Sequence, residues 1–137
     1  MDAYAIVAKA RELIGTPYHH QARLPGIGMD CAGPIVWVGQ QLGFLPAGFD
    51  VSDYGRQPTG QLDALLSEWL EPSEKTPGAI VGIRWHKATH HLGIVGEHRG
   101  LTLIHALQMA GGVREHSLHG KWAEQITGVW KYKGAIL

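Results

Sequence analysis

The sequence predicts an α+β fold in which helices come first and antiparallel strands follow. Apolar residues recur with a helical period in the first half of the chain. The second half instead holds short β-branched or aromatic runs separated by turn residues. A length of 137 residues suits one domain with a buried core, so a single domain over residues 1–137 is expected.

Two amphipathic helices are expected in the first half. Apolar side chains follow the helical period over residues 2–14 and again from about Cys31 to Leu42. Proline fits a helix only in its first turn, so Pro34 places the start of the second helix near Cys31. Residues 18–30 are expected to form a loop, and a short helix is expected over residues 61–70.

Four runs in the second half are expected to form an antiparallel sheet. The segment His98-Arg99-Gly100 predicts a tight hairpin between the second and third runs. One more helical turn is expected between Ser117 and Gln125. The four runs cover residues 79–85, 91–97, 101–107 and 128–136.

Charge and hydropathy argue against some classes of partner. Twelve basic and twelve acidic residues give a formal net charge of zero. Nucleic acid and anionic membranes attract a surplus of Lys and Arg, so neither is expected as a partner. The sequence has no apolar run of membrane-spanning length. Its start also lacks the basic and apolar pattern of a signal peptide.

Cys31 is the single cysteine and the strongest candidate for a reactive group. It lies between Gly28 and Gly33, where a glycine-rich turn runs into the second helix. At a helix start, backbone N–H groups and the helix dipole favour a thiolate, which is a nucleophile when a histidine can reach it. A free cysteine is also a common packing residue, so this alternative stays open.

Two histidines are candidates for the base and for the group that orients it. His91 precedes Leu92-Gly93-Ile94-Val95, and His105 lies in the next run. If a hairpin joins these runs, the two rings fall on one face, with His91 as base and His105 fixing its tautomer. A satisfied, partly buried histidine is the equal alternative for His105. Gly93, on the same face as His91, is expected to let a helix pack closely.

Six of the remaining histidines are expected to face solvent, and a zinc site is a weaker alternative. His86 and His90 have the spacing of zinc ligands on a helix, but the segment holds no His-Glu-x-x-His and its neighbours predict loop and strand. No metal site and no cofactor are therefore expected. The histidines expected at the surface are His19, His20, His90, His98, His116 and His119.

Several short motifs occur in the order seen in NlpC-type cell-wall peptidases, which are papain-like cysteine peptidases. The chain resembles this family over nearly its whole length. Two of these motifs are most similar to the branch found in phage tail and gene-transfer-agent clusters. They are Tyr18-His19-His20-Gln21-Ala22 and the ending Gly128-Val129-Trp130-Lys131-Tyr132. The other motifs are Gly15-Thr16-Pro17-Tyr18, Asp30-Cys31-Ala32-Gly33, Pro77-Gly78, His91-Leu92-Gly93-Ile94-Val95 and Ile104-His105-Ala106.

The resemblance implies a papain-like fold and a role for each site residue. It implies that Cys31 is the nucleophile, His91 the base and His105 the orienting residue. Tyr18 and Asp30 would line the substrate-binding pocket. The implied substrates are peptidoglycan stem peptides, cut at the bond between D-γ-glutamyl and the diamino acid.

The resemblance also implies partners, and three departures from the family pattern bear on activity. Phage tail proteins are implied as further partners, with the chain either in a virion or in the cytoplasm before release. Ala32 replaces the usual serine, Ala79 replaces the Asp of Pro-Gly-Asp, and Pro34 replaces a larger aliphatic residue. A non-catalytic tail assembly or tip component with the same fold is the alternative function.

Overall fold

The structure is a computed structural model that describes residues 1–19, 22–49, 67–85 and 88–137, with no side chains described at 85 and 88–90. Its centre is a six-stranded antiparallel sheet with the strand order β3-β8-β4-β5-β6-β7. The sheet strands are β3 (Leu70–Pro72), β4 (Ile80–Trp85), β5 (Ala88–Glu97), β6 (Leu101–Leu107), β7 (Gly112–Ser117) and β8 (Ile126–Tyr132).

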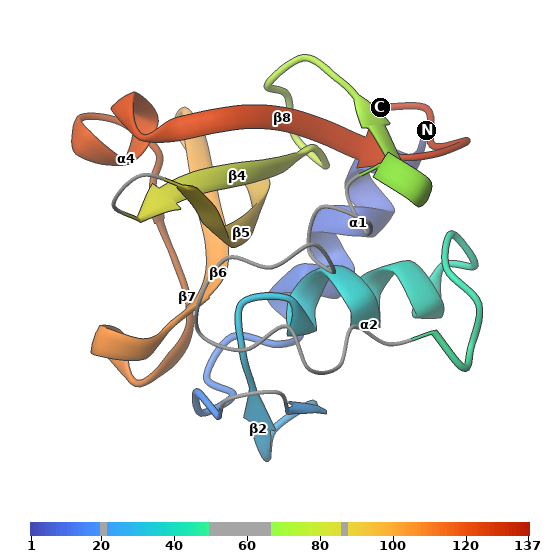
Figure 1. The fold of residues 1–137 in the computed structure, drawn as a ribbon, viewed down its shortest axis with the longest axis horizontal. Helices are drawn as coiled ribbons and strands as arrows, with labels where there is room; N and C mark the ends of the chain where they lie inside the picture. Colours follow the sequence, from blue (N-terminus) through green and yellow to red (C-terminus); the bar gives the residue numbers. More distant parts are fainter. Residues whose placement is uncertain (20–21, 50–66, 86–87) are drawn as a thin grey trace.

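Two helices, α1 (Asp2–Arg11) and α2 (Gly33–Gln41), lie together beside the sheet, as Figure 1 shows. The small elements are β1 (Arg23–Leu24), β2 (Gly28–Met29), the 3-10 helix η1 (Gln108–Ala110) and α4 (Lys121–Glu124). This arrangement confirms the predicted α+β class with helices first.

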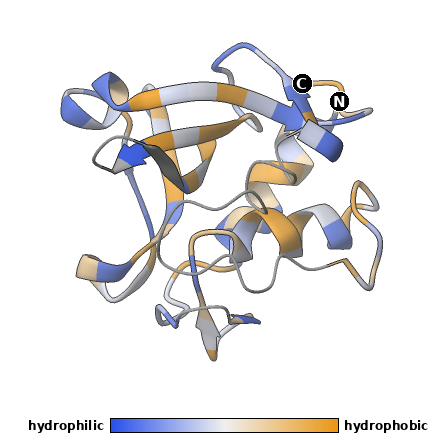
Figure 2. Cartoon of the chain, in the orientation of Figure 1, coloured by the Kyte–Doolittle hydropathy of each residue, from blue (hydrophilic) through white to orange (hydrophobic). Residues whose placement is uncertain are grey.

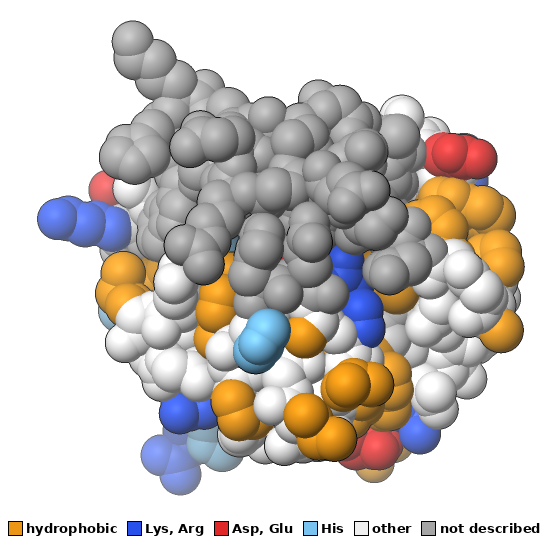
Figure 3. Space-filling model, turned by 60° about the horizontal axis from the view of Figure 1, so that its bottom comes forward, with side chains coloured by type: hydrophobic (Ala, Val, Ile, Leu, Met, Phe, Trp, Pro, Cys, Tyr) orange, Lys and Arg blue, Asp and Glu red, His pale blue; other side chains and the backbone are white. Residues whose placement is uncertain are grey.

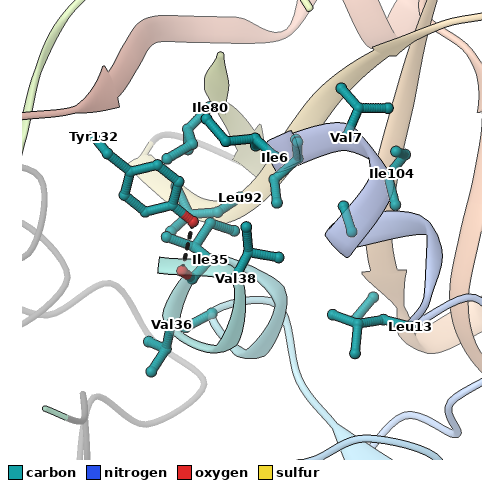
Figure 4. Packing of buried hydrophobic residues seen from close by; sticks show 14 of the residues in the cluster. Ile6, Val7, Leu13, Ile35, Val36, Val38, Ile80, Leu92, Ile104 and Tyr132 are labelled. Carbon is teal, nitrogen blue, oxygen red and sulfur yellow. Dashed lines mark hydrogen bonds between the residues drawn. The ribbon is translucent and has the colours of Figure 1, made fainter. Parts of the chain in front are cut away.

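The main hydrophobic core lies between these helices and one face of the sheet. Leu92 and Ile94 of β5 alternate with residues of the opposite face, as the two-residue period of a strand requires. Tyr132 at the end of β8 reaches into the core, where its hydroxyl donates a hydrogen bond of 2.6 Å to the Ile35 carbonyl (Figure 4). This buried contact ties β8, the last strand along the chain, to α2.

A second, smaller cluster covers the other face of the sheet. Its buried members come from β4 and the residue before it, from β5 and β6, and from the segment before α4, and Trp122 of α4 packs against them. Figure 2 shows α4 as mostly hydrophilic, and Trp122 is the residue of this short helix that packs against the cluster. The buried members are Ala79, Val81, Ile83, Val95, Leu103 and Leu118.

The segment before β1 joins the helical part to the sheet. The Gly15 N–H donates to the Val113 carbonyl at 3.0 Å, and the Val113 N–H donates back to Thr16 at 2.9 Å. Tyr18 then bonds to the Gly111 carbonyl at 2.9 Å. A side chain on Gly112 would collide with the Thr16 carbonyl, so glycine permits this close backbone approach.

Most element predictions hold, and the errors have local causes. The strand over residues 101–107, its hairpin with β5 and the helical turn before Gln125 are confirmed. β7 was missed because its sequence, GVREHS, is half polar. The short pair β1 and β2 lies in the expected loop. The helix expected over 61–70 lies mostly outside the described residues, but its last residue, Leu70, begins strand β3.

Surface charge follows the neutral composition. In Figure 3 the acidic and basic side chains are scattered over the described part of this face and do not form a patch of one sign.

The chain ends meet, since the Asp2 N–H donates a hydrogen bond of 2.8 Å to the Ile136 carbonyl. Among the described residues, no helix is long and apolar enough to cross a membrane.

Candidate active site

Cys31 lies just before α2 and is buried, with 6% of the residue exposed. The helix begins two residues later than predicted. The cause is Asp30, whose backbone carbonyl and Oδ1 accept hydrogen bonds from the Gly33 N–H at 3.0 Å and 3.2 Å. Pro34 falls in the first helical turn, as predicted.

The surroundings of Cys31 keep the thiol protonated. Burial and the Asp30 carboxylate raise the pKa of the Cys31 thiol to about 12. A hydrogen bond with the Leu92 backbone and the charge of Arg23 oppose this shift only in part. The expectation that the helix start would favour a thiolate is therefore wrong for the resting site, because burial and the Asp30 carboxylate outweigh the groups that favour the charged form.

The contact with Leu92 fixes where the thiol lies relative to the sheet. Leu92 follows His91 directly in β5, and both are buried, with 0% and 5% exposure. Because neighbouring strand residues point to opposite faces, Leu92 enters the main core while His91 points to the other face. The structure thus brings Cys31 to the strand that carries His91.

His91 and His105 lie together on one face of the β5–β6 hairpin. Nε2 of His91 and Nδ1 of His105 are 2.6 Å apart, a short hydrogen bond between two ring nitrogens. The rings meet edge-on, with centroids 4.9 Å apart and planes at 73°. This is the neighbourhood predicted from the hairpin, and it orients the His91 ring through one nitrogen.

Gly93 makes this ring contact possible, in a different way from the one predicted. A methyl group on Gly93 would collide with Leu103 and would lie 3.2 Å from Cβ of His105. The space beside Gly93 is therefore taken by β6, not by a helix. The missing side chain lets His105 lean toward His91 across the strand pair.

His116 extends the row of histidines, and its assignment as a solvent-facing residue was wrong. It lies in β7 opposite Leu103, which places its ring diagonally beside His105. Nε2 of His105 and Nε2 of His116 are 2.7 Å apart, and Nδ1 of His116 is 3.0 Å from the Ser117 carbonyl oxygen. The missed strand β7 hid this signal, since three histidines on adjacent strands form one row only once β7 is paired.

Trp122 and burial keep the middle of this row dry. The Trp122 ring meets His105 edge-on at 5.0 Å, and its centroid is also 5.0 Å from that of His116. His105 is fully buried. Burial and the neighbouring His91 and His116 lower the pKa of His105 to about 2, so this ring stays neutral.

The two predicted substrate-binding residues lie on the approach to α2. Asp30 is fully buried, and its Oδ1 accepts a 2.8 Å hydrogen bond from Nη1 of Arg23. Tyr18 is half-buried and bridges to Met29, the residue before Asp30. Asp30 therefore adjoins Cys31 in the chain, and Tyr18 is paired with the residue two positions before Cys31.

The other histidines fall into two groups. His19, His98 and His119 are exposed, as predicted. His20, His86 and the side chain of His90 lie outside the described residues, and so does the zinc spacing built on the last two. Among the described residues, no group of three or more His, Cys, Asp or Glu side chains is arranged to hold a metal ion. The rings of the row meet nitrogen to nitrogen and do not converge on one point.

The fold is the papain-like fold of the NlpC/p60 proteins, as comparison with solved structures shows. The crystal structure of the NlpC/p60 domain of the peptidoglycan hydrolase SagA is similar with a TM-score of 0.63 and 24% identity, over 94% of this chain and 97% of that one. No protein-family model matches the chain. No curated protein matches it by sequence.

Two longer proteins contain a similar domain. A lipoprotein-like NLP/P60 family protein from Staphylococcus aureus has a TM-score of 0.63 and 19% identity, over 95% of this chain and 41% of that one. An NlpC/P60 family protein from Bacillus cereus has a TM-score of 0.66 and 18% identity, over 95% of this chain and 40% of that one. The present chain spans about two fifths of each.

Proposed function

We propose that this chain is a cysteine peptidase that hydrolyses peptidoglycan stem peptides, with residues 1–137 acting as one peptidase domain. The observation that carries the proposal is the 2.6 Å contact between His91 Nε2 and His105 Nδ1, on the strand whose next residue contacts the Cys31 thiol. A nucleophile, a base and a group that orients the base are the three parts such a site needs. The similar SagA domain is from a peptidoglycan hydrolase, which supports the substrate class.

The reaction follows from the position of each group. Because Nε2 of His91 is engaged by His105, Nδ1 is the nitrogen that takes the proton from the Cys31 Sγ–H. The resulting thiolate attacks the carbonyl carbon of the scissile amide, and the Cys31 backbone N–H helps to stabilise the oxyanion. The His91 imidazolium then gives its proton to the leaving amine, which departs as a thioester forms.

Water completes the cycle. It attacks the thioester carbonyl while His91 takes one of its protons, and the carboxylic acid product leaves as that proton returns to Cys31. A thiol pKa of about 12 means that an isolated Cys31 would hold almost no thiolate at neutral pH. Proton transfer to His91 is therefore part of the reaction and not a preceding equilibrium with solvent.

The scissile bond and the biological setting are finer parts of this proposal. We assign cleavage to the amide between D-γ-glutamyl and the diamino acid, with Tyr18 and Asp30 lining the pocket. An association with phage tail proteins would bring the enzyme to the cell wall. Both parts rest on the sequence motifs around Tyr18, Cys31 and Trp130.

Hydrolysis of purified muropeptides tests the proposal. Wild-type protein should release a fragment with a new amino group on the diamino acid, detected by mass spectrometry. Cys31→Ala and Cys31→Ser should be inactive while keeping the wild-type melting temperature, and His119→Gln should serve as an active control at an exposed histidine. Equal turnover by wild type and Cys31→Ala would eliminate the nucleophile, and cleavage at another bond would correct the specificity.

A non-catalytic tail component is the second candidate, and the high thiol pKa favours it. A purely structural Cys31 should react with iodoacetamide only as the pH rises toward about 12. A Cys31 whose thiol transfers its proton to His91 should react at neutral pH as well. The pH dependence of alkylation therefore separates the two functions without requiring a substrate.

A further inference from the structure

The row of three histidines ends on a group with a fixed hydrogen-bonding role. The Ser117 carbonyl, 3.0 Å from Nδ1 of His116, can only accept a hydrogen bond. Nδ1 of His116 therefore carries a proton. In the neutral ring, Nε2 of His116 then has no proton and must accept.

This polarity passes through the row to the catalytic base. At 2.7 Å, Nε2 of His105 must donate to the bare Nε2 of His116. Since His105 is neutral, its Nδ1 has no proton and accepts from Nε2 of His91 at 2.6 Å. Neutral His91 then has its lone pair on Nδ1, where it can receive the thiol proton.

We propose that His116 is a positioning residue that sets the tautomers of His105 and His91 and so keeps His91 ready to act as a base toward Cys31. This inference deepens the proposed peptidase function and rests on it. A backbone carbonyl here does what a buried carboxylate does elsewhere: it fixes which ring nitrogen holds the proton. The Ser117 carbonyl thereby fixes the tautomer of His91 through the rings of His116 and His105.

The same geometry predicts what a second proton on His116 would do. A second proton on His116 places N–H on its Nε2, which reverses both ring-to-ring hydrogen bonds. His91 would then hold its proton on Nδ1 as a neutral ring. As an imidazolium it would face a donor on His105, so the ion pair with the thiolate loses its support.

The groups around His116 from other elements define its charge environment. His105 and Trp122 pack against its ring from β6 and α4. The adjacent pocket is lined by Arg11, His98, Thr102 and Glu115, together with His116 and Ser117. Arg11 donates to both carboxylate oxygens of Glu115 at 3.0 Å and 2.9 Å, and Thr102 donates to it at 2.7 Å, so this carboxylate is already engaged.

Two variants of similar shape separate positioning from packing. In His116→Gln, the amide oxygen can still accept from His105, so kcat should stay within about threefold of wild type. In His116→Met, the acceptor is gone, and losing one neutral hydrogen bond predicts a fall in kcat of roughly tenfold with little change in KM. His116→Lys offers only donors toward His105 and should lose more than the Met variant.

The pH profile gives a readout that a packing role would not move. The acid limb of kcat/KM should shift to lower pH in His116→Gln, because this variant cannot take up the reversing proton. His119→Gln, at an exposed histidine, should keep the wild-type profile. Equal kcat in the Gln and Met variants, or an unchanged acid limb in the Gln variant, would overturn the proposal.

Nitrogen-15 NMR of the ring nitrogens tests the tautomers without any substrate. At neutral pH, His105 should carry its proton on Nε2 and His116 on Nδ1. A proton on Nδ1 of His105 would refute the relay even if the protein proves to be an active peptidase. If muropeptides are not cleaved but these tautomers are found, the peptidase proposal fails and the tautomer assignment stands.

Discussion

The two faces of the β5–β6 hairpin are built from the same strands but differ in character: one is apolar and the other carries histidine rings. On the helix side, Leu92, Ile94 and Ile104 are fully buried in an apolar core. On the other side, His91 and His105 are also buried, among far fewer apolar neighbours. The helix side supplies stability, whereas the other side holds polar rings in a dry row, which needs every ring nitrogen to have a partner.

Removing His91, the proposed base, should give the largest effect. His91→Ala should lower kcat for muropeptide hydrolysis at least about a thousandfold, since general acid–base transfer by a positioned group contributes this much. In the same variant, alkylation by iodoacetamide should rise about tenfold per pH unit between pH 7 and 10, because the uncoupled thiol has a pKa of about 12. His119→Ala is the matched control, and a neutral-pH alkylation rate equal to wild type in His91→Ala would contradict the role of His91.

A methyl group added between β5 and β6 should have the second-largest effect, on the face that carries the histidines. Gly93→Ala should destabilise the fold by about 1–3 kcal/mol, because the added carbon meets Leu103 and His105. Activity should fall as well, since His105 cannot keep its contact with His91. Gly48→Ala is a control at a glycine with open space. Urea unfolding and muropeptide turnover measure both effects, and full activity in Gly93→Ala would show that the ring contact is not needed.

Acid should weaken the polar face through His105. The unfolded residue titrates near pH 6.5, whereas the folded ring has a pKa of about 2, so the unfolded state binds more protons below pH 6.5. The free energy of unfolding should therefore fall as the pH drops from 7 to 5, with His105 contributing about 1 kcal/mol per pH unit below 6.5. This window lies above the titration of Glu115, whose pKa Arg11 lowers further.

The check on this pH dependence is a comparison of slopes. His105→Gln should unfold with a shallower dependence on pH than wild type over this range, whereas His119→Gln should not. Identical slopes in wild type and His105→Gln would show that His105 titrates normally in the folded protein.

A change on the helix side should give the smallest effect, a loss of stability without a loss of activity. Tyr132→Phe removes the 2.6 Å hydrogen bond to Ile35 and should cost about 1 kcal/mol of stability. It should leave kcat unchanged, because the hydroxyl lies in the core of the other face. Tyr4→Phe, at a residue 84% exposed, is the control for loss of a hydroxyl. A drop in kcat for Tyr132→Phe at a temperature where it is folded would show that the two faces are not independent.

The apolar face was easier to predict from sequence than the polar one. Local periodicity identified α1, α2 and the strands of the hairpin, and the two-residue alternation placed His91 and His105 together. β7 was not recognised, because its polar residues lack a strand pattern and its pairing comes from residues 102–107. His116 was lost with it, since its role depends on a partner eleven residues away.

The protonation of Cys31 could not be predicted from the sequence either. Gly28 and Gly33 indicated a turn into a helix, which is correct, but the pKa of the thiol depends on how deeply the sheet buries it. One contact of the thiol is with the backbone of Leu92 in β5, more than sixty residues later in the chain. The Asp30 carboxylate raises the pKa of the thiol further, although the sequence suggested only that this residue was polar.

The backbone link between Gly15–Tyr18 and the start of β7 has a mechanical consequence. Backbone hydrogen bonds join the segment before Cys31 to β7, the strand that carries His116. The helical part and the sheet therefore cannot move apart by a hinge motion. Under the proposed function, a peptidoglycan substrate would therefore bind to a site that is already assembled. Amide protons of Gly15, Tyr18 and Val113 should accordingly exchange with heavy water as slowly as those of the central strands, and only on global unfolding.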